Sequence, residues 1–223
     1  MQIVRIWDLP TRLFHWVLAL AVIGLVVTGK VGGNAMVWHF RLGYVVFALL
    51  LFRLVWGLVG GHWSRFVAFI YAPATLIAYL RGEGRPEHAA GHSPTGAMSV
   101  FALLAVLGLQ VATGLFSDDE IAASGPLTTL VAGKTVSLAT GWHKHWGQWL
   151  VIGLVVLHVA AIIYYRFAKR QNLVTAMLTG DKTLEVALTA SRDGVADRLK
   201  ALLVLALAAG VVWWVVSLGG AKP

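Results

Sequence analysis

Four histidines stand in or beside long apolar segments of this 223-residue chain: His15, His39, His143 and His158. Imidazole is the commonest protein ligand for metals, and an ionisable side chain inside a membrane segment marks a functional site by default. If successive segments run in opposite directions, two of these histidines lie at each of two depths. That arrangement suits two stacked haems, each held between two imidazoles.

The composition indicates a membrane protein. Hydrophobic residues make up 58% of the chain and charged residues only 13%. A helix needs roughly 20 mostly apolar residues to cross the hydrocarbon core, where all backbone polar groups must be paired internally. We therefore predict a single transmembrane domain over residues 1–223, an all-α helical bundle with five spans. Their ranges are 13–29, 39–60, 97–116, 142–167 and 199–218.

The distribution of Lys and Arg predicts the orientation, because cytoplasmic flanks collect positive charge during insertion. With the N-terminus inside and the C-terminus outside, thirteen of these residues are cytoplasmic and five are external. The net charge of +8 is then a topology signal, with contact to lipid headgroups a lesser role. We expect no nucleic-acid partner.

The chain contains no cysteine. This excludes disulfides, iron–sulfur clusters and the Cys-x-x-Cys-His motif that attaches haem covalently. Any haem must be bound non-covalently, through histidine.

Depth along the spans pairs the histidines. His15 follows Arg12 closely, and His158 precedes Arg166 by eight residues, or about 12 Å of helix, so both lie in the cytoplasmic half. His39 and His143 each follow a tryptophan at the outer entrance of a span. We predict that His15 and His158 bind the iron of one haem and that His39 and His143 bind the iron of the other.

The spacing within the fourth span tests this pairing. His143 and His158 are fifteen positions apart, which in a regular α-helix places them about 60° apart around the axis and about 22 Å apart along it. His145 comes out about 140° from His158, a poorer fit unless the helix entrance is irregular. We prefer His143 and keep His145 as a substitute. A lone histidine in a span is often only a hydrogen-bonding residue, so the joint pattern carries the prediction.

The segments between the spans are less informative. Residues 66–80 are apolar, too short to cross and interrupted by Pro73, which favours an interfacial or re-entrant helix. Residues 82–96 form a predicted polar loop, and 172–198 a mixture of surface helix and loop. His62, His88 and His92 fall in these cytoplasmic connections, where we expect solvated side chains and assign no iron.

The same residues carry a family resemblance. The segments Trp7-Asp8-Leu9-Pro10-Thr11-Arg12-Leu13-Phe14-His15-Trp16, His39-Phe40-Arg41-Leu42-Gly43 and Arg53-Leu54-Val55-Trp56-Gly57 resemble the bacterial cytochrome b561 and nickel-iron hydrogenase b-type cytochrome family. The likeness continues through Gly91-His92-Ser93-Pro94-Thr95-Gly96-Ala97, Thr113-Gly114-Leu115-Phe116, His143-Lys144, Leu157-His158 and Asn172-Leu173-Val174 with Met177. It covers nearly the whole chain.

The resemblance implies a bacterial inner-membrane protein with a four-helix core around two b haems and a fifth C-terminal transmembrane helix. It also implies electron exchange between the quinone pool and a redox partner. His92 and Ser93 are candidates for a quinone site near the cytoplasmic haem. The family commonly has Asn at the position of Ser93, and the nearby His145 leaves the outer ligand position open.

Three arginines near span ends are candidate partners for the anionic haem propionates: Arg12, Arg41 and Arg53. A propionate would be costly in lipid unless it is paired. Each arginine serves equally well as an interfacial anchor.

Two axial imidazoles saturate a haem iron, which favours reversible one-electron transfer over oxygen binding. Our main hypothesis is a dihaem b-type cytochrome, an electron-transfer subunit of an oxidoreductase system, working between quinone and a periplasmic or membrane-bound redox protein. The alternatives are a superoxide-oxidising quinone reductase and a histidine-lined metal or proton transporter without haem. Whether the chain assembles with copies of itself is left open.

Overall fold

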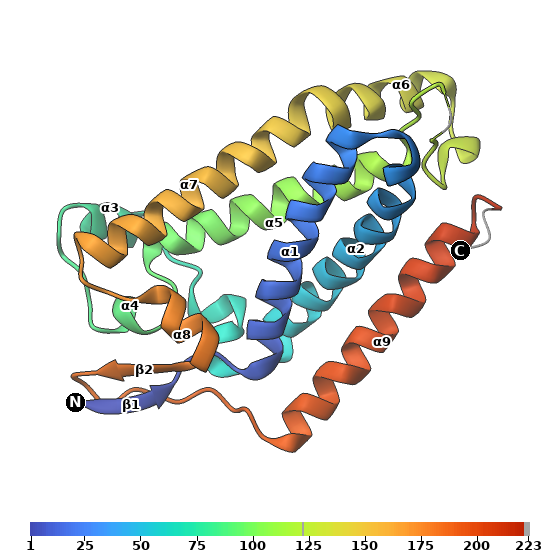
Figure 1. Ribbon diagram of the computed structural model, residues 1–223. Helices are drawn as coiled ribbons and strands as arrows, with labels where there is room; N and C mark the ends of the chain where they lie inside the picture. The colour runs from blue at the N-terminus through green and yellow to red at the C-terminus, as the bar shows by residue number, and fades with distance from the viewer. Residues whose placement is uncertain (122, 221–223) are drawn as a thin grey trace. The chain divides into compact units, whose positions relative to one another are not determined.

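The computed structural model describes residues 1–121 and 123–220. Five long helices dominate it (Figure 1): α1 (Leu9–Val31), α2 (Met36–Val59), α5 (Pro94–Leu115), α7 (Gln148–Phe167) and α9 (Val195–Ser217). Each predicted span falls on one of them, and each is long and apolar enough, alone or with the short helix before it, to cross a membrane. The five predicted spans are therefore confirmed as helices.

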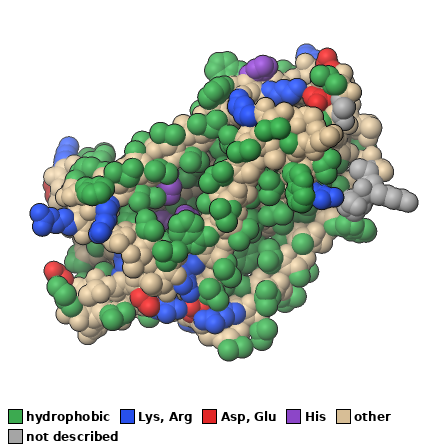
Figure 2. Space-filling model, in the orientation of Figure 1, with side chains coloured by type: hydrophobic (Ala, Val, Ile, Leu, Met, Phe, Trp, Pro, Cys, Tyr) green, Lys and Arg blue, Asp and Glu red, His purple; other side chains and the backbone are tan. Residues whose placement is uncertain are grey.

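Large apolar side chains remain exposed on all five helices, for example Leu20, Leu58, Leu109, Val156 and Leu207. Hydrophobic side chains spread over much of the face drawn in Figure 2. A chain in water would bury such residues, whereas a lipid bilayer solvates them without cost. The exposed apolar surface therefore agrees with a multi-pass membrane protein.

Short elements connect the long helices. They are β1 (Gln2–Arg5), the 3-10 turns Gly33–Ala35, His62–Ser64, Phe66–Ala68 and Thr128–Leu130, α3 (Pro73–Leu80), α4 (Glu87–Ala90), α6 (Gly133–Gly141), a π-helical segment at Trp142–Gly147, α8 (Leu173–Thr179) and β2 (Asp181–Leu184).

Three of these elements correct the sequence-based expectations. Pro73 does not interrupt a helix over 66–80 but begins α3, a position where its missing N–H costs nothing. The fourth span was predicted to begin at position 142, yet helical structure starts at Gly133 and passes through the π-helical segment. The segment 172–198 contains β2, which the sequence analysis missed.

The strand β2 pairs antiparallel with β1, with Gln2 opposite Leu184 and Arg5 opposite Asp181. This pairing joins residues almost 180 positions apart along the chain, so no local pattern announces it. The ribbon lies near the N-terminus in Figure 1.

The chain forms two compact units. The first unit comprises Met1–His15, Arg53–Ala102 and Val155–Val204, and the second comprises Trp16–Phe52, Leu103–Leu154 and the described residues from Leu205 onward. Each of the five long helices contributes a segment to both units. His15 and His158 belong to the first unit, and His39 and His143 belong to the second.

Asp8 organises part of the first unit. Its carboxylate is fully buried and accepts hydrogen bonds from the Thr11 backbone N–H, the Trp56 indole, the Gly61 N–H and the Ser64 hydroxyl. The Thr11 bond caps the first turn of α1. The buried acid thus holds the start of α1, just ahead of Arg12 and His15, against the end of α2.

Candidate haem-binding sites

The first histidine pair lies within the first unit. His15 comes from α1 and His158 from α7, and their ring centres are 6.4 Å apart with the ring planes tilted by 51°. The structure therefore brings together the two histidines that were paired by their depth along the spans.

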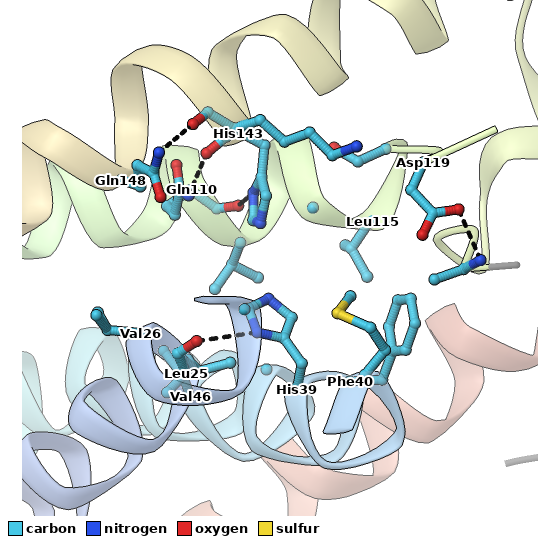
Figure 3. A pocket seen from close by; sticks show the side chains of 18 of the residues that line it. Leu25, Val26, His39, Phe40, Val46, Gln110, Leu115, Asp119, His143 and Gln148 are labelled. Atoms are coloured by element: carbon cyan, nitrogen blue, oxygen red, sulfur yellow. Dashed lines mark hydrogen bonds between the residues drawn. The ribbon is translucent and has the colours of Figure 1, made fainter. Parts of the chain in front are cut away.

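The second pair lies within the second unit. His39, in α2, and His143, in the π-helical segment before α7, have ring centres 6.1 Å apart and nearly perpendicular planes. Figure 3 shows the two imidazoles pointing toward one another. His145 is exposed instead, so the structure places His143 and not its substitute opposite His39.

These distances suit iron ligation. An imidazole nitrogen binds a metal at about 2 Å and lies about 1 Å from its ring centre, so two imidazoles on opposite sides of one iron have ring centres about 6 Å apart. Rings about 8 Å apart could not share one metal. Both pairs therefore fit a metal held between them.

Backbone carbonyls orient the second pair. His39 Nδ1 donates a hydrogen bond to the Leu25 carbonyl at 3.0 Å, and His143 Nδ1 donates one to the Gln110 carbonyl at 2.9 Å. A carbonyl can only accept, so the proton sits on Nδ1 and the lone pair stays on Nε2. Metal-binding histidines typically show this arrangement, because the second bond fixes both tautomer and ring orientation.

Gln110 strengthens the same site. Its side-chain amide donates to the His143 carbonyl at 2.9 Å. The π-helical segment is therefore hydrogen-bonded to α5 through both the side chain and the backbone carbonyl of Gln110. Gln110 was not among the residues expected from the sequence to form the site. A polar residue in the middle of an apolar span was the available signal.

Two glycines make room for the imidazoles. A Cβ on Gly114 would lie 2.9 Å from His143 Cε1, and a Cβ on Gly29 would lie 3.1 Å from His39 Cε1. A larger residue at either position would press on a ligand ring. The backbones of α1 and α5 therefore approach the two rings as closely as glycine allows.

A cavity of about 430 Å³ opens between the second pair and the helices around it. Its walls are mostly apolar, from α1, α2, α5 and α7, and both histidines line it (Figure 3). Lys30 and Lys144 also line it, whereas Arg41 is not among the described lining residues and stacks on the Trp38 ring. Asp118 and Asp119 line it as well. An apolar cavity with two imidazoles at its wall fits a haem, and Lys30 and Lys144 are its candidate partners for the anionic propionates.

The first unit offers two arginines near its pair. Arg53 is only 3% exposed and lies over the Phe66 ring, and its Nη1 has no hydrogen-bond partner in the described part of the chain. Arg12 donates to the Leu178 carbonyl but leaves Nε buried and likewise without a partner there. A buried guanidinium with an unsatisfied N–H is costly, so both side chains fit anionic groups that complete their bonding.

His92 is not the solvated loop residue that we expected. Its ring packs on Phe69 and Trp7, with centres 4.3 and 4.7 Å apart, and its Nδ1 is buried. Burial, reinforced by the charges of Arg53 and Lys182, lowers the pKa of His92 to about 3. The imidazole is therefore neutral at physiological pH.

The other two histidines in the connecting segments, His88 and His62, accept hydrogen bonds from nearby arginines. His88 is also buried, contrary to expectation, and its Nδ1 accepts a hydrogen bond from the Arg85 N–H. His62 receives one from the Arg65 guanidinium. Among the described residues, no cluster of three or more His, Asp or Glu side chains forms a further metal site.

Comparison with known proteins adds a decisive finding. The family model of the prokaryotic cytochrome b561 matches residues 6–180, which include both histidine pairs. The chain belongs to this family. The cytochrome b561 resemblance drawn from the motifs is confirmed, and so is the all-α membrane bundle.

Several relatives of this cytochrome share most of its length. A probable Ni/Fe-hydrogenase B-type cytochrome subunit of Cupriavidus necator is 28% identical over 213 residues, covering 81% of this chain and 87% of the relative. The corresponding protein of Azotobacter vinelandii is 28% identical over 211 residues, covering 79% and 87%. A probable Ni/Fe-hydrogenase 1 B-type cytochrome subunit of Escherichia coli is 24% identical over 210 residues, covering 78% and 88%. No solved structure matches the chain.

As a b-type cytochrome, the protein binds haem b and transfers electrons in the membrane. The matched region ends at residue 180, so it leaves out β2 and α9. Both histidine pairs and the three candidate propionate partners, Arg12, Arg41 and Arg53, lie inside it. The part of this cytochrome that the family shares is thus the part that carries the candidate haem sites.

Proposed function

We propose that this cytochrome b561 carries two b haems, each bound by two histidines, and moves electrons between them across the membrane. The observation that carries the proposal is the spacing of the two pairs, 6.4 and 6.1 Å between ring centres. His15 and His158 would bind one iron, and His39 and His143 the other. When bound, a haem with two axial imidazoles supplies reversible one-electron transfer.

The chain's own residues then have defined tasks. The Leu25 and Gln110 carbonyls keep Nε2 of the second pair free for iron. Arg12 and Arg53 in the first unit, with Lys30 and Lys144 in the second, would pair with propionates. Apolar walls exclude water, which lowers the reorganisation that accompanies each change of charge.

The two ends of the electron path are proposed from different observations. Relatives described as hydrogenase cytochrome subunits suggest a hydrogenase as the redox partner. We place this partner on the outer side of the inner membrane, where the second pair would lie. His92 and Ser93, which belong to the same unit as the first pair, are the proposed contacts of a quinone at the cytoplasmic side. The charge distribution supports this orientation, with the N-terminus inside.

The alternatives gain no support of their own. Membership of a cytochrome family favours a haem protein over a histidine-lined transporter. Oxidation of superoxide at the outer haem would use the same ligands, and no described residue points to it specifically.

Haem counting tests the ligand assignment. We expect two haems per chain in the purified protein, one in the His143→Ala variant and two in the matched His145→Ala variant, because only His143 faces His39. Pyridine haemochrome absorbance against protein concentration measures the ratio. Loss of a haem in His145→Ala, with none lost in His143→Ala, would overturn the assignment.

A further inference from the structure

A chain of hydroxyl groups crosses the first unit beside the proposed quinone contacts. The Tyr79 hydroxyl, from α3, lies 2.9 Å from the Tyr165 hydroxyl near the end of α7. The Tyr165 hydroxyl lies 3.1 Å from Ser93 Oγ, which directly precedes α5. Three separate elements thus contribute one hydroxyl each to a continuous hydrogen-bonded series.

The hydrogen bonds of Ser93 leave its hydroxyl proton available at one end of this series. Ser93 Oγ accepts a hydrogen bond from the Gly96 N–H at 3.2 Å and has Tyr165 as its other close partner. A hydroxyl has one proton to donate and two lone pairs to accept with. If Tyr165 donates to Ser93, both lone pairs are used and the Ser93 proton remains to be given. The Thr95 hydroxyl, at 3.4 Å, is a distant acceptor for it.

Tyr79, at the other end of the series, lies close to solvent. Tyr79 is half-buried at the end of α3, directly before residues 81–87, all of which are exposed and which include Glu83 and Glu87. Burial and the bond to Tyr165 raise the pKa of Tyr79 to about 12. Tyr79 therefore stays a neutral hydroxyl, able to accept one proton while it donates another.

We propose that Tyr79, Tyr165 and Ser93 form a proton relay between cytoplasmic water and one carbonyl oxygen of a quinone bound beside Ser93. The inference rests on the quinone exchange proposed above. It assigns a role to two tyrosines that neither the haem sites nor the family comparison uses.

Reduction of a quinone to quinol takes two electrons from the cytochrome and two protons, and forms an O–H bond at each carbonyl oxygen. At one of these oxygens Ser93 gives up its proton, Tyr165 reprotonates Ser93, Tyr79 reprotonates Tyr165, and a proton from cytoplasmic water replaces that of Tyr79. The other oxygen takes its proton from water by a separate route. Quinol oxidation runs the same steps backward, because each hydroxyl pair can bond in either direction.

The test compares two adjacent tyrosines on α7. Tyr165→Phe removes the central hydroxyl, whereas Tyr164→Phe removes the hydroxyl of a side chain that is 53% exposed and is the matched control. Tyr79→Phe breaks the same series one step earlier. Each purified, haem-loaded protein is reduced with dithionite and mixed with decylubiquinone or menadione, and the haem absorbance reports its oxidation, in H2O and in D2O.

We expect Tyr165→Phe and Tyr79→Phe to oxidise at least about tenfold more slowly than wild type, with a larger solvent isotope effect, since proton delivery becomes limiting. Haem content, spectra and the rate of reduction by dithionite should not change, which a merely structural defect would alter. Tyr164→Phe should match wild type. If Tyr165→Phe loses haem, Tyr79→Phe decides by the same criteria.

Two outcomes contradict the relay in different ways. If wild type and both relay variants oxidise at equal rates, the hydroxyls only anchor the loop and the relay is wrong, while quinone exchange stands. If the reduced wild type transfers no electrons to either quinone, the proposed quinone exchange fails and the relay fails with it.

Discussion

At the scale of single residues, the second haem site depends on how closely α5 approaches one imidazole. His143 is bonded to the Gln110 carbonyl on one side and touches the Gly114 position on the other, both in α5. The ring cannot move away from Gly114 without straining its Nδ1 hydrogen bond to the Gln110 carbonyl. Glycine at position 114 is therefore a requirement of the site and not of the helix, where alanine would be favoured.

We predict that Gly114→Ala displaces His143 and weakens or removes the haem of the second unit, because the added Cβ would lie 2.9 Å from the imidazole. The expected cost is about 1–3 kcal/mol of stability, typical of overpacking. Gly108→Ala in the same helix meets nothing within 4 Å and should be neutral. Haem stoichiometry and thermal unfolding measure both variants; equal behaviour of the two would contradict the prediction.

At the scale of elements, the start of α1 is held by a residue from far along the chain. Asp193 accepts a hydrogen bond from the Leu9 N–H at 3.0 Å and forms ion pairs with Arg5 at 2.6 Å and Arg198 at 3.3 Å. Its side chain is only 7% exposed. A carboxylate at a helix N-terminus also interacts favourably with the helix dipole. The loop after β2 thus anchors the helix that carries His15.

We predict that Asp193→Asn lowers the free energy of unfolding by about 1 kcal/mol at pH 7. Burial alone would raise the pKa of Asp193, but the Leu9 N–H and the two arginines outweigh it and lower the pKa below its usual value. The stabilisation is therefore present above the unfolded pKa, near 4, and is lost as the pH falls through the lower folded value.

Thermal unfolding of wild type and Asp193→Asn at a series of pH values checks this prediction. The difference between them should shrink as the pH falls below about 4. Glu185→Gln is the control, because Glu185 lies in the same connection and is exposed. A difference that does not vary with pH would show that the charge of Asp193 is not responsible.

At the scale of the whole molecule, an odd number of spans places the two termini on opposite sides. The five candidate spans and the excess of Lys and Arg on alternate connections point to a cytoplasmic N-terminus. The proposed orientation would decide on which side each histidine pair lies, and hence where a quinone and a redox partner would exchange electrons.

We predict that green fluorescent protein inserted in the exposed loop at residues 81–87 is fluorescent and that alkaline phosphatase fused to the C-terminus is active. The first reporter works only in the cytoplasm and the second only outside the inner membrane. The opposite pattern in both fusions would invert the topology, and with it the assignment of the cytoplasmic and external haem sites.

The spans and their histidines follow from the sequence, because apolar runs and helical spacing are local properties. The length of a span is set by the bilayer, and the depth of His15 or His158 can be counted along its helix from the nearest arginine. The motifs around His15, His39 and His92 were sufficient to place the chain in its family. The fifth span was equally visible, although it lies outside the matched region.

Only the tertiary structure shows that His143 faces His39 while His145 is exposed. A regular helix was assumed in the sequence analysis, and the π-helical segment Trp142–Gly147 together with the Gln110 contacts turns His143 inward and leaves His145 exposed. The burial of His92 between Trp7 and Phe69 and the hydrogen bond of Asp193 to the start of α1 are likewise visible only in the tertiary structure. These features join residues that are distant in the chain, and contacts of that kind leave no periodic trace in the sequence.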